Sequence, residues 1–578
     1  MSFHYTVEKN VQMLVYLMKQ HGVKKVIASP GTTNVTFVAS IQNDPYFEIY
    51  SAADERSAAY MACGLAAESH DPVALSCTGA TASRNYIPGL TEAYYRKLPV
   101  LAITSTQHTG RIGQLCAQVI DRSQVQNDIA VKSVTIPLIG SAEDEWDCNI
   151  KLNDALLALR RHGGGPVHLN LMTQYSNYFS VNPLPEFRMI NRIGLNDAFP
   201  ALPTGKIGIF VGAHLTWSQE LTEAVDEFCA KYDAVVFKDH TSNFNGKFGV
   251  EYSLVAAQNY PYATRQMDLL IDMGEMSGAY MNLQPKSVWR VNPDGEIRDR
   301  WKKLTKVFEM EEIDFFKHYN ALRSETTETG YYAECSAEYA DLLRRLPELP
   351  FSNDWIASVT AGRISEGSAL HLGILNTLRS WNFFDVPKNV DCFCNTGGFG
   401  IDGLMSTCVG ASLANPDRLH FLVLGDLAFF YDLNSIANHN VGRNLRILLV
   451  NNGCGTEFKN YNHFAAQFGD MANEYMAAMG HYGNKSPQLV KHYATDLGFE
   501  YLTASSKEEY LAVLDRFLTP TLTDRPMLLE VFTDYHDESD ALQDLNTMEI
   551  STKEKTKQAV KNLIGADTAH KLKKLIKG

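Results

Sequence analysis

Asp426 and Asn452 are the two residues whose types and spacing point most directly to chemistry. Each follows an apolar run typical of a buried strand, 419–424 before Asp426 and 447–450 before Asn452. The segment 427–440 between the runs has room for one helix, which predicts a parallel strand–helix–strand unit. Ligands of such sheets bind beyond the carboxyl ends of the strands, and carboxylate and amide oxygens suit Mg²⁺ or Ca²⁺. The spacing therefore predicts a metal-bridged diphosphate site, with ordinary turn residues as the alternative.

A glycine motif, Gly-x-Gly-x-x-Gly at 398–403, follows a predicted strand at 389–394 and opens a predicted helix at 401–414. Backbone amides at such a helix N-terminus cradle phosphate. The same pattern is typical of dinucleotide-binding folds, so NAD or FAD is the competing cofactor. Two observations favour the metal–diphosphate hypothesis. The Asn451-Asn452 pair has no role in dinucleotide binding, and the motif lies late in the chain.

Together, Gly425-Asp426 and Asn451-Asn452 resemble the signature of thiamin diphosphate (ThDP) enzymes. The segments that follow two early strands, 53–60 and 77–82, are similar to the pyrimidine-binding domain of that family. The resemblance is strongest to its MenD-like branch, synthases that join succinyl semialdehyde to isochorismate. It implies that Asp426, Asn452 and the backbone carbonyl of Cys454 hold Mg²⁺, or Mn²⁺ or Ca²⁺, beside the cofactor.

The resemblance also implies roles for single residues. Glu55 would hydrogen-bond the pyrimidine ring of the cofactor. Ile401 would wedge the cofactor into a bent shape, unless it is plain helix core. Ser368, near the start of a helix predicted over 365–381, matches a serine at the substrate site. The cofactor-binding residues would be Glu55, Thr78, Ser368, Gly398, Phe399, Ile401, Gly425, Leu427, Ala428, Asn452 and Thr456.

Two further residues are candidates for catalysis beside Glu55. Gln118 matches a substrate-side glutamine of the branch. His108 could shuttle a proton, as histidines do in related decarboxylases, or it could be a surface loop residue.

Several arginines that bind carboxylates in the MenD-like branch are replaced in this chain. The matching positions hold Thr33, Gln107, Leu372 and Thr396. We therefore predict decarboxylation of a 2-oxo acid, with transfer of the resulting carbanion or acyl group to a proton, an aldehyde or another small acceptor. The alternatives are the branch's own synthase reaction and a ThDP-fold protein retained for assembly without catalysis.

The whole chain of 578 residues is too long for one core and predicts three domains. Alternating strands and helices indicate an α/β fold of doubly wound parallel sheets. We expect a pyrimidine-binding domain at 1–185, a central domain at 190–345 and a diphosphate- and metal-binding domain at 350–545. A helical tail would follow at 546–578.

Composition limits the partners. The net charge is −14, and no long basic stretch precedes the C-terminus, which argues against nucleic acid or an anionic membrane. No signal pattern or apolar run of membrane-spanning length is evident, so a cytoplasmic protein with reduced cysteines is expected. Glu55 and Asp426 fall in different domains, which in the ThDP family come from different chains. A homodimer or homotetramer is therefore expected.

Overall fold

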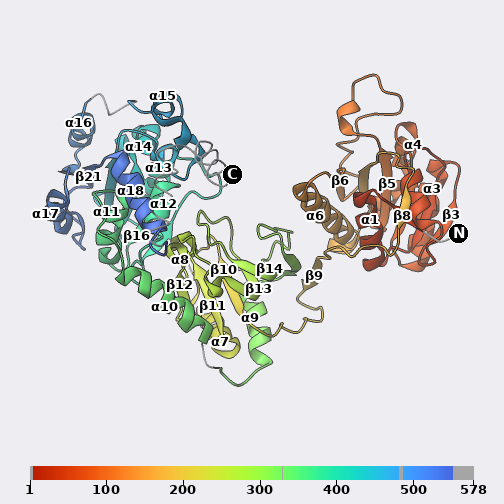
Figure 1. Ribbon diagram of the computed structural model, residues 1–578, viewed down its shortest axis with the longest axis horizontal. Coiled ribbons are helices and arrows are strands. Elements are labelled where there is room, and N and C mark those ends of the chain that lie inside the picture. Colours follow the sequence, from red (N-terminus) through yellow and green to blue (C-terminus); the bar gives the residue numbers. More distant parts are fainter. Residues whose placement is uncertain (1–3, 216, 328–329, 481–485, 551–578) are drawn as a thin grey trace, which may run out of the picture. The chain divides into compact units, whose positions relative to one another are not determined.

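The computed structural model describes residues 4–215, 217–327, 330–480 and 486–550. It divides into two compact units (Figure 1). Unit 1 comprises Met1–Phe199 with Asp294–Glu309, and unit 2 comprises Pro200–Pro293 with Met310–Gly578. The three domains and their bounds stay a prediction, and most of the tail lies outside the described residues. Among the described residues, no helix has both the length and the apolar character needed to cross a membrane.

Unit 1 is built on a six-stranded parallel sheet in the order β3-β2-β4-β5-β7-β6. The order reverses between β2 and β4. The strands are β2 (Lys25–Ala28), β3 (Glu48–Ser51), β4 (Val73–Cys77), β5 (Val100–Thr106), β6 (Lys132–Ile136) and β7 (Val167–Met172). The helices are α1 (Lys9–Gln20), α2 (Val35–Ile41), α3 (Glu55–Ser69), α4 (Thr81–Asn85), α5 (Ile87–Tyr95) and α6 (Ala142–Ala158).

Side chains of alternate strand residues enter two different cores, one on each face of the sheet. Ala74 belongs to the core that includes residues of α1 and α6, whereas its neighbours Val73 and Leu75 belong to the core of α3 and α5. This alternation follows from the two-residue period of a strand. It confirms the predicted doubly wound α/β class. Unit 1 also holds the antiparallel pair β1 (Tyr5–Thr6) and β8 (Phe179–Val181), and the parallel pair β9 (Asn191–Gly194) and β15 (Leu304–Glu309).

Unit 2 contains two parallel sheets. The first has the order β12-β11-β10-β13-β14. Its strands are β10 (Ile207–Val211), β11 (Ala234–Lys238), β12 (Gly249–Glu251), β13 (Gln266–Met273) and β14 (Gln284–Val291). The helices of this part are α7 (Gln219–Tyr232), α8 (Ser253–Ala257), α9 (Glu312–Ala321) and α10 (Gly330–Arg344).

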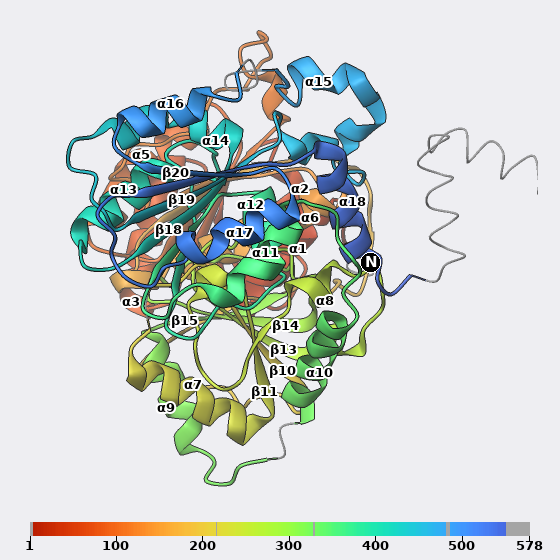
Figure 2. The same ribbon diagram turned by 90° about the vertical axis from the view of Figure 1, so that its left-hand side faces the viewer.

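The second sheet of unit 2 has the order β17-β16-β18-β19-β21-β20 and reverses between β16 and β18. Figure 2 shows its strands between α14 and α16 on one side and α11 and α17 on the other. Its strands are β16 (Ala369–Leu372), β17 (Asp391–Phe393), β18 (His420–Gly425), β19 (Leu445–Asn451), β20 (Glu500–Ala504) and β21 (Met527–Phe532). The helices are α11 (Asn353–Thr360), α12 (Asn376–Trp381), α13 (Leu404–Ala414), α14 (Asp426–Tyr431), α15 (Ala472–Tyr475), α16 (Leu489–Asp496), α17 (Lys507–Phe517) and α18 (Tyr535–Asn546).

The helix predicted over 365–381 is wrong. Ala369–Leu372 is instead the strand β16, paired in parallel with β17 and β18, and only Asn376–Trp381 is helical. All four residues of β16 are buried, so strand pairing and packing on both sides decide their conformation, and the local helical pattern of the sequence does not. The single helix predicted over 427–440 is likewise shorter, because α14 ends at Tyr431 and a 3₁₀ segment follows.

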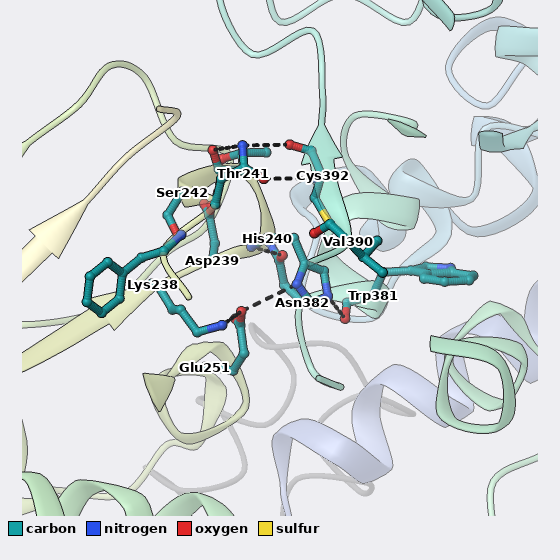
Figure 3. A network of polar contacts seen from close by, with 12 residues as sticks. Lys238, Asp239, His240, Thr241, Ser242, Glu251, Trp381, Asn382, Val390 and Cys392 are labelled. Atoms are coloured by element: carbon teal, nitrogen blue, oxygen red, sulfur yellow. Dashed lines mark hydrogen bonds and ion pairs between the residues drawn. The ribbon is translucent and has the colours of Figure 1, made fainter. Parts of the chain in front are cut away.

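A buried polar network connects the two sheets of unit 2 (Figure 3). Glu251 Oε1 lies 3.2 Å from Lys238 Nζ and 3.3 Å from His240 Nδ1. The other ring nitrogen of His240 is 2.8 Å from the backbone oxygen of Trp381, and Asn243 bonds the backbone of Cys392 at both its N–H and its carbonyl. The turn after β11 in the first sheet therefore holds both ends of the segment 381–392, which leads into β17 of the second sheet.

Candidate active site

Asp426 lies at the carboxyl end of β18, as the sequence predicts, and begins α14. Its side chain is buried, at 5% exposure. One carboxylate oxygen accepts from the backbone N–H of Leu427 at 2.8 Å, and the other accepts from the backbone N–H of Gly453 at 2.7 Å. Burial raises the pKa of Asp426 to about 6. A cation beside the carboxylate would favour its ionised form.

Asn452 and Cys454 follow the end of the neighbouring strand β19. The side-chain oxygen of Asn452 lies 3.4 Å from the backbone nitrogen of Cys454. Among the residues that the structure describes, no group of three or more His, Cys, Asp or Glu side chains could hold a metal ion. A metal at Asp426 would therefore need the Asn452 amide oxygen, a backbone oxygen and ligand phosphate. That hard-oxygen set is the type that Mg²⁺ prefers, so these residues fit the predicted metal.

A cavity opens at the point where the strand order of this sheet reverses. The segment after β16 and the segment after β18 form two of its sides, and the turn after β19 forms another. Ligands of open parallel sheets bind at such points. Eight predicted cofactor or metal residues line this one cavity: Ile401, Gly425, Asp426, Leu427, Ala428, Asn452, Cys454 and Thr456.

Thr456 contributes an unsatisfied polar atom to this cavity. Its side chain is buried, and among the described residues its hydroxyl oxygen has no nitrogen or oxygen partner and only the weak contact of the neighbouring Cys454 thiol. A buried hydroxyl without a partner is costly, and a ligand with acceptor oxygens would satisfy it. Thr456 therefore fits a phosphate-bearing cofactor. Ile401 is partly buried and packs beside the core of α13 and β18, so it belongs both to the cavity wall and to the helix core.

Glu538 lines the cavity and was not among the predicted residues. It lies on α18 and is 6% exposed. Its carboxylate accepts from the hydroxyl of Thr533 at 2.6 Å and from the backbone N–H of Asn353 at 3.0 Å. Burial raises its pKa to about 7. Position relative to a strand end did not single it out, because Asp534 and Asp537 both stand closer than Glu538 to the end of the predicted strand 526–532.

Among the predicted cofactor residues of unit 2, three do not line this cavity. Ser368 precedes the amino end of β16, whereas the cavity lies beyond the carboxyl end, and its hydroxyl pairs with that of Ser365 at 2.7 Å. Ser368 was predicted to lie near the start of a helix. This placement was wrong because Ala369–Leu372 is the strand β16. Gly398 lines a separate hollow in the glycine-rich loop, and Phe399 is exposed with a φ of 55°.

The predicted residues of unit 1 gather near the carboxyl ends of its strands. Glu55 is the first residue of α3, half-buried, directly after Asp54, whose side chain caps the helix by accepting from Arg56 N at 2.9 Å. Thr78 follows β4 and exchanges a hydrogen bond of 2.6 Å with the hydroxyl of Thr33. The turns after β2 and β4 are in direct contact, since a Cβ on Gly31 would lie 2.5 Å from that of Thr78.

His108 and Gln118 are both exposed. His108 caps a 3₁₀ turn, where Nδ1 accepts from the backbone N–H of Gly110 at 3.0 Å. Gln118 adopts a left-handed φ of 62°. This hydrogen bond agrees with the alternative that His108 is a surface loop residue. A role of His108 in proton transfer stays a prediction.

The positions of the replaced arginines differ in their surroundings. Thr33, Leu372 and Thr396 are buried, and Leu372 is the last residue of β16. Gln107 is half-buried and accepts a hydrogen bond from Arg111. None of the four supplies a positive charge.

Comparisons with known proteins agree with this geometry. Residues 9–131 match the family model described as "Thiamine pyrophosphate enzyme, N-terminal TPP binding domain". A parallel α/β fold with this domain and an Asp426–Asn452 cavity defines a ThDP-dependent enzyme. The 2-succinyl-5-enolpyruvyl-6-hydroxy-3-cyclohexene-1-carboxylate synthase of Bacteroides thetaiotaomicron is 32% identical over 562 residues, covering 93% of this chain and 98% of its own.

Two further synthases with the same name extend the likeness. That of Bacteroides fragilis is 31% identical over 564 residues, covering 93% of this chain and 99% of its own. That of Desulfotalea psychrophila is 26% identical over 560 residues, covering 91% and 98%. The chain belongs to the MenD-like family of ThDP-dependent enzymes.

Proposed function

We propose that this protein uses ThDP and a divalent metal ion to remove CO₂ from a 2-oxo acid and to join the remaining acyl carbon to a small acceptor. In the reaction, the bond between the carboxylate and the carbonyl carbon breaks and CO₂ leaves. A new bond then forms from that carbon to a proton or to an acceptor carbon such as an aldehyde. ThDP, when bound, supplies the electron sink that such a cleavage needs.

The observation that carries the proposal is the cavity at the reversal point of the second sheet of unit 2, which the buried side chains of Asp426 and Thr456 both line. Asp426, Asn452 and the carbonyl of Cys454 would hold the metal. Glu55 would hold a proton at the pyrimidine ring of the cofactor. Ile401 would restrict the cofactor's shape.

The first experiment measures CO₂ release by ThDP- and Mg²⁺-loaded protein from a panel of 2-oxo acids, with and without aldehyde acceptors. Release from at least one acid that depends on ThDP, and is lost in Asp426→Ala, supports the proposal. Binding of ThDP without turnover of any acid would instead favour a non-catalytic ThDP-fold protein.

A second candidate is the synthase reaction named for the relatives, and their full-length coverage favours it. Thr33, Gln107, Leu372 and Thr396 weigh against it, because each lost arginine removes charge-assisted hydrogen bonds of about 1.5–3 kcal/mol to a carboxylate-rich acceptor. Assay with 2-oxoglutarate and isochorismate separates the two. Efficient turnover there would establish the synthase reaction and remove the case for an acceptor with fewer carboxylates.

We also propose that the protein works as a dimer or a larger assembly in which two chains complete each site. Mixing the inactive variants Glu55→Gln and Asp426→Ala tests this. If one chain supplies Glu55 and another Asp426, mixed dimers regain one intact site and activity returns. If both residues act within one chain, the mixture stays inactive.

A further inference from the structure

The cavity at the reversal point of the second sheet of unit 2 is lined by two buried carboxylates. Asp426 and Glu538 are 5% and 6% exposed. A third carboxylate of the lining, Glu457, is paired with Arg379 at 3.0 Å. Among the described residues, the lining of this cavity contains no lysine, arginine or histidine. Buried charges in proteins are paired or coordinate metals, so this excess of negative charge favours a bound cation.

Glu538 is held at both of its carboxylate oxygens. One oxygen accepts from the hydroxyl of Thr533 at 2.6 Å, and the other accepts from the backbone N–H of Asn353 at 3.0 Å. Thr533 directly follows β21, and Asn353 is the first residue of α11. Two separate elements therefore fix the position of this carboxylate. A carboxylate can accept about four hydrogen bonds, so it has room for a further donor.

That further donor is the side-chain amide of Asn452. It hydrogen-bonds to Glu538, and both residues line the cavity. An amide carries a donor NH₂ group and an acceptor oxygen at its two ends, whereas an ionised carboxylate only accepts. The NH₂ end of Asn452 therefore faces Glu538, and the amide oxygen is turned away from it. The contact of this oxygen with the backbone nitrogen of Cys454 is long, at 3.4 Å, so the oxygen keeps the capacity to bind a metal.

Helix α18 contacts the segment after β19 at two further points. Ser539 donates from its hydroxyl to the backbone oxygen of Lys459 at 3.2 Å, and the hydroxyl of Tyr461 donates to Asp540 at 2.6 Å. Neither Ser539 nor Asp540 lines the cavity, whereas Glu538 does. The helix therefore offers a direct comparison between a residue that only anchors this segment and one that also reaches the site.

We propose that Glu538 is a positioning residue for the metal, which fixes the amide of Asn452 so that its oxygen faces the cation. This inference rests on the proposed function, because it takes the metal to be held by Asp426, Asn452 and the carbonyl of Cys454. Glu538 acts through Asn452 and is not itself a ligand. Groups that hydrogen-bond to a metal ligand in this way orient the ligand. Without Glu538, the amide can turn its NH₂ end towards the metal, and that end cannot bind a cation.

The affinity of the ThDP-loaded protein for Mn²⁺ tests the proposal, and the electron paramagnetic resonance signal of free Mn²⁺ measures it. Glu538→Gln keeps the shape of the side chain but can present either end of its own amide to Asn452. Mn²⁺ should therefore bind about 10- to 100-fold more weakly. Asp540→Asn, on the same helix, is the matched control and should bind Mn²⁺ as the wild type does. Unchanged affinity in a folded Glu538→Gln protein would overturn the proposal.

The variant Asn452→Asp separates the orientation of a ligand from a general effect of charge or packing. A carboxylate presents an oxygen at either end, so its binding of a metal does not depend on which end faces Glu538. Adding Glu538→Gln to Asn452→Asp should therefore cost much less affinity than Glu538→Gln costs in the wild type. An equal loss in both backgrounds would mean that Glu538 acts by charge or packing, and the proposal would be wrong.

Thr533→Val decides the matter if Glu538→Gln does not fold. It removes one of the bonds that hold Glu538 and leaves the carboxylate in place, so Mn²⁺ should bind a few-fold more weakly. Affinity equal to that of the wild type would count against the proposal.

These measurements need no 2-oxo acid, which keeps the inference separate from the proposed function. If the affinities follow the expected order while no 2-oxo acid is turned over, the proposed function fails and the role of Glu538 stands. If 2-oxo acids are turned over while Glu538→Gln binds Mn²⁺ as the wild type does, only the role of Glu538 fails.

Discussion

The carboxylate of Asp426 accepts a hydrogen bond of 2.7 Å from the backbone N–H of Gly453, which joins the end of β18 to the turn after β19. Asp426 and Asn452, which lie 26 positions apart in the sequence, are therefore brought together by a hydrogen bond to the buried carboxylate of Asp426. Gly453 has a φ of 80°, a conformation that glycine adopts at little cost. This turn directs the amide of Gly453 at Asp426, and Asn452 lines the same cavity.

Asp426→Asn should weaken the binding of ThDP with Mg²⁺ about 10- to 100-fold, because the amide keeps the shape but loses the charge that holds the cation. Titration calorimetry measures the affinity. Asp417→Asn, a change of an exposed carboxylate, is the control and should bind as the wild type does. Equal affinity in Asp426→Asn would show that the metal is held elsewhere.

Glu55→Gln should keep ThDP binding within a few-fold and lose most turnover, since glutamine can still hydrogen-bond but cannot hold the proton at the pyrimidine ring. Calorimetry and CO₂ release read the two effects separately. Glu68→Gln, on the exposed side of the same helix α3, is the control. Full turnover in Glu55→Gln would remove Glu55 from the chemistry.

Glu251→Gln should destabilise unit 2 by about 3–5 kcal/mol, because it leaves the half-buried Lys238 and the buried His240 without their shared carboxylate. Thermal or urea denaturation measures the loss. Glu220→Gln removes one partner of an exposed ion pair with Lys317 and should cost about 1 kcal/mol or less. If both variants were equally stable, the network would contribute little to folding.

The stability of unit 1 should depend on pH through His168. Its ring nitrogens lie 2.8 Å from the hydroxyl of Thr104 and 2.9 Å from that of Ser133, and burial lowers its pKa to about 3. Below the usual histidine pKa of about 6.5, the unfolded chain takes up a proton that the folded chain does not. The free energy of unfolding therefore falls as the pH falls from about 6.5 towards 3.

Comparison with His168→Gln measures this effect. Between pH 7 and pH 5 the wild type should lose about 2 kcal/mol more than the variant, by the linkage of one proton. His492→Gln, a change at an exposed position, should follow the wild type. Parallel pH curves for wild type and His168→Gln would contradict the assignment.

Much of the fold was predictable because most elements carry local signals. The helix α3 begins and ends where the sequence predicts, since Asp54 caps its start and alanines fill its buried face. β16 was missed because Ala369–Leu372 has no strand-like composition, and its conformation comes from pairing with β17 and β18, whose residues are up to about fifty positions away.

The site was predictable where its residues sit next to a strand end. Asp426 and Asn452 were found by position relative to such ends and Thr456 by the family resemblance, and all three line one cavity. Glu538 was not, although it is buried and lines the same cavity. Its importance depends on its neighbours in space, and spacing along the chain carries no such information.

The bonds from Asn243 to Cys392 and from His240 to Trp381 have a consequence for any attempt to shorten this enzyme. Deleting the first sheet of unit 2 would remove the hydrogen-bond partners of these backbone groups, which lie just before the glycine-rich loop. A trimmed version should therefore misfold or lose cofactor affinity, even though every proposed ligand to the metal would still be present.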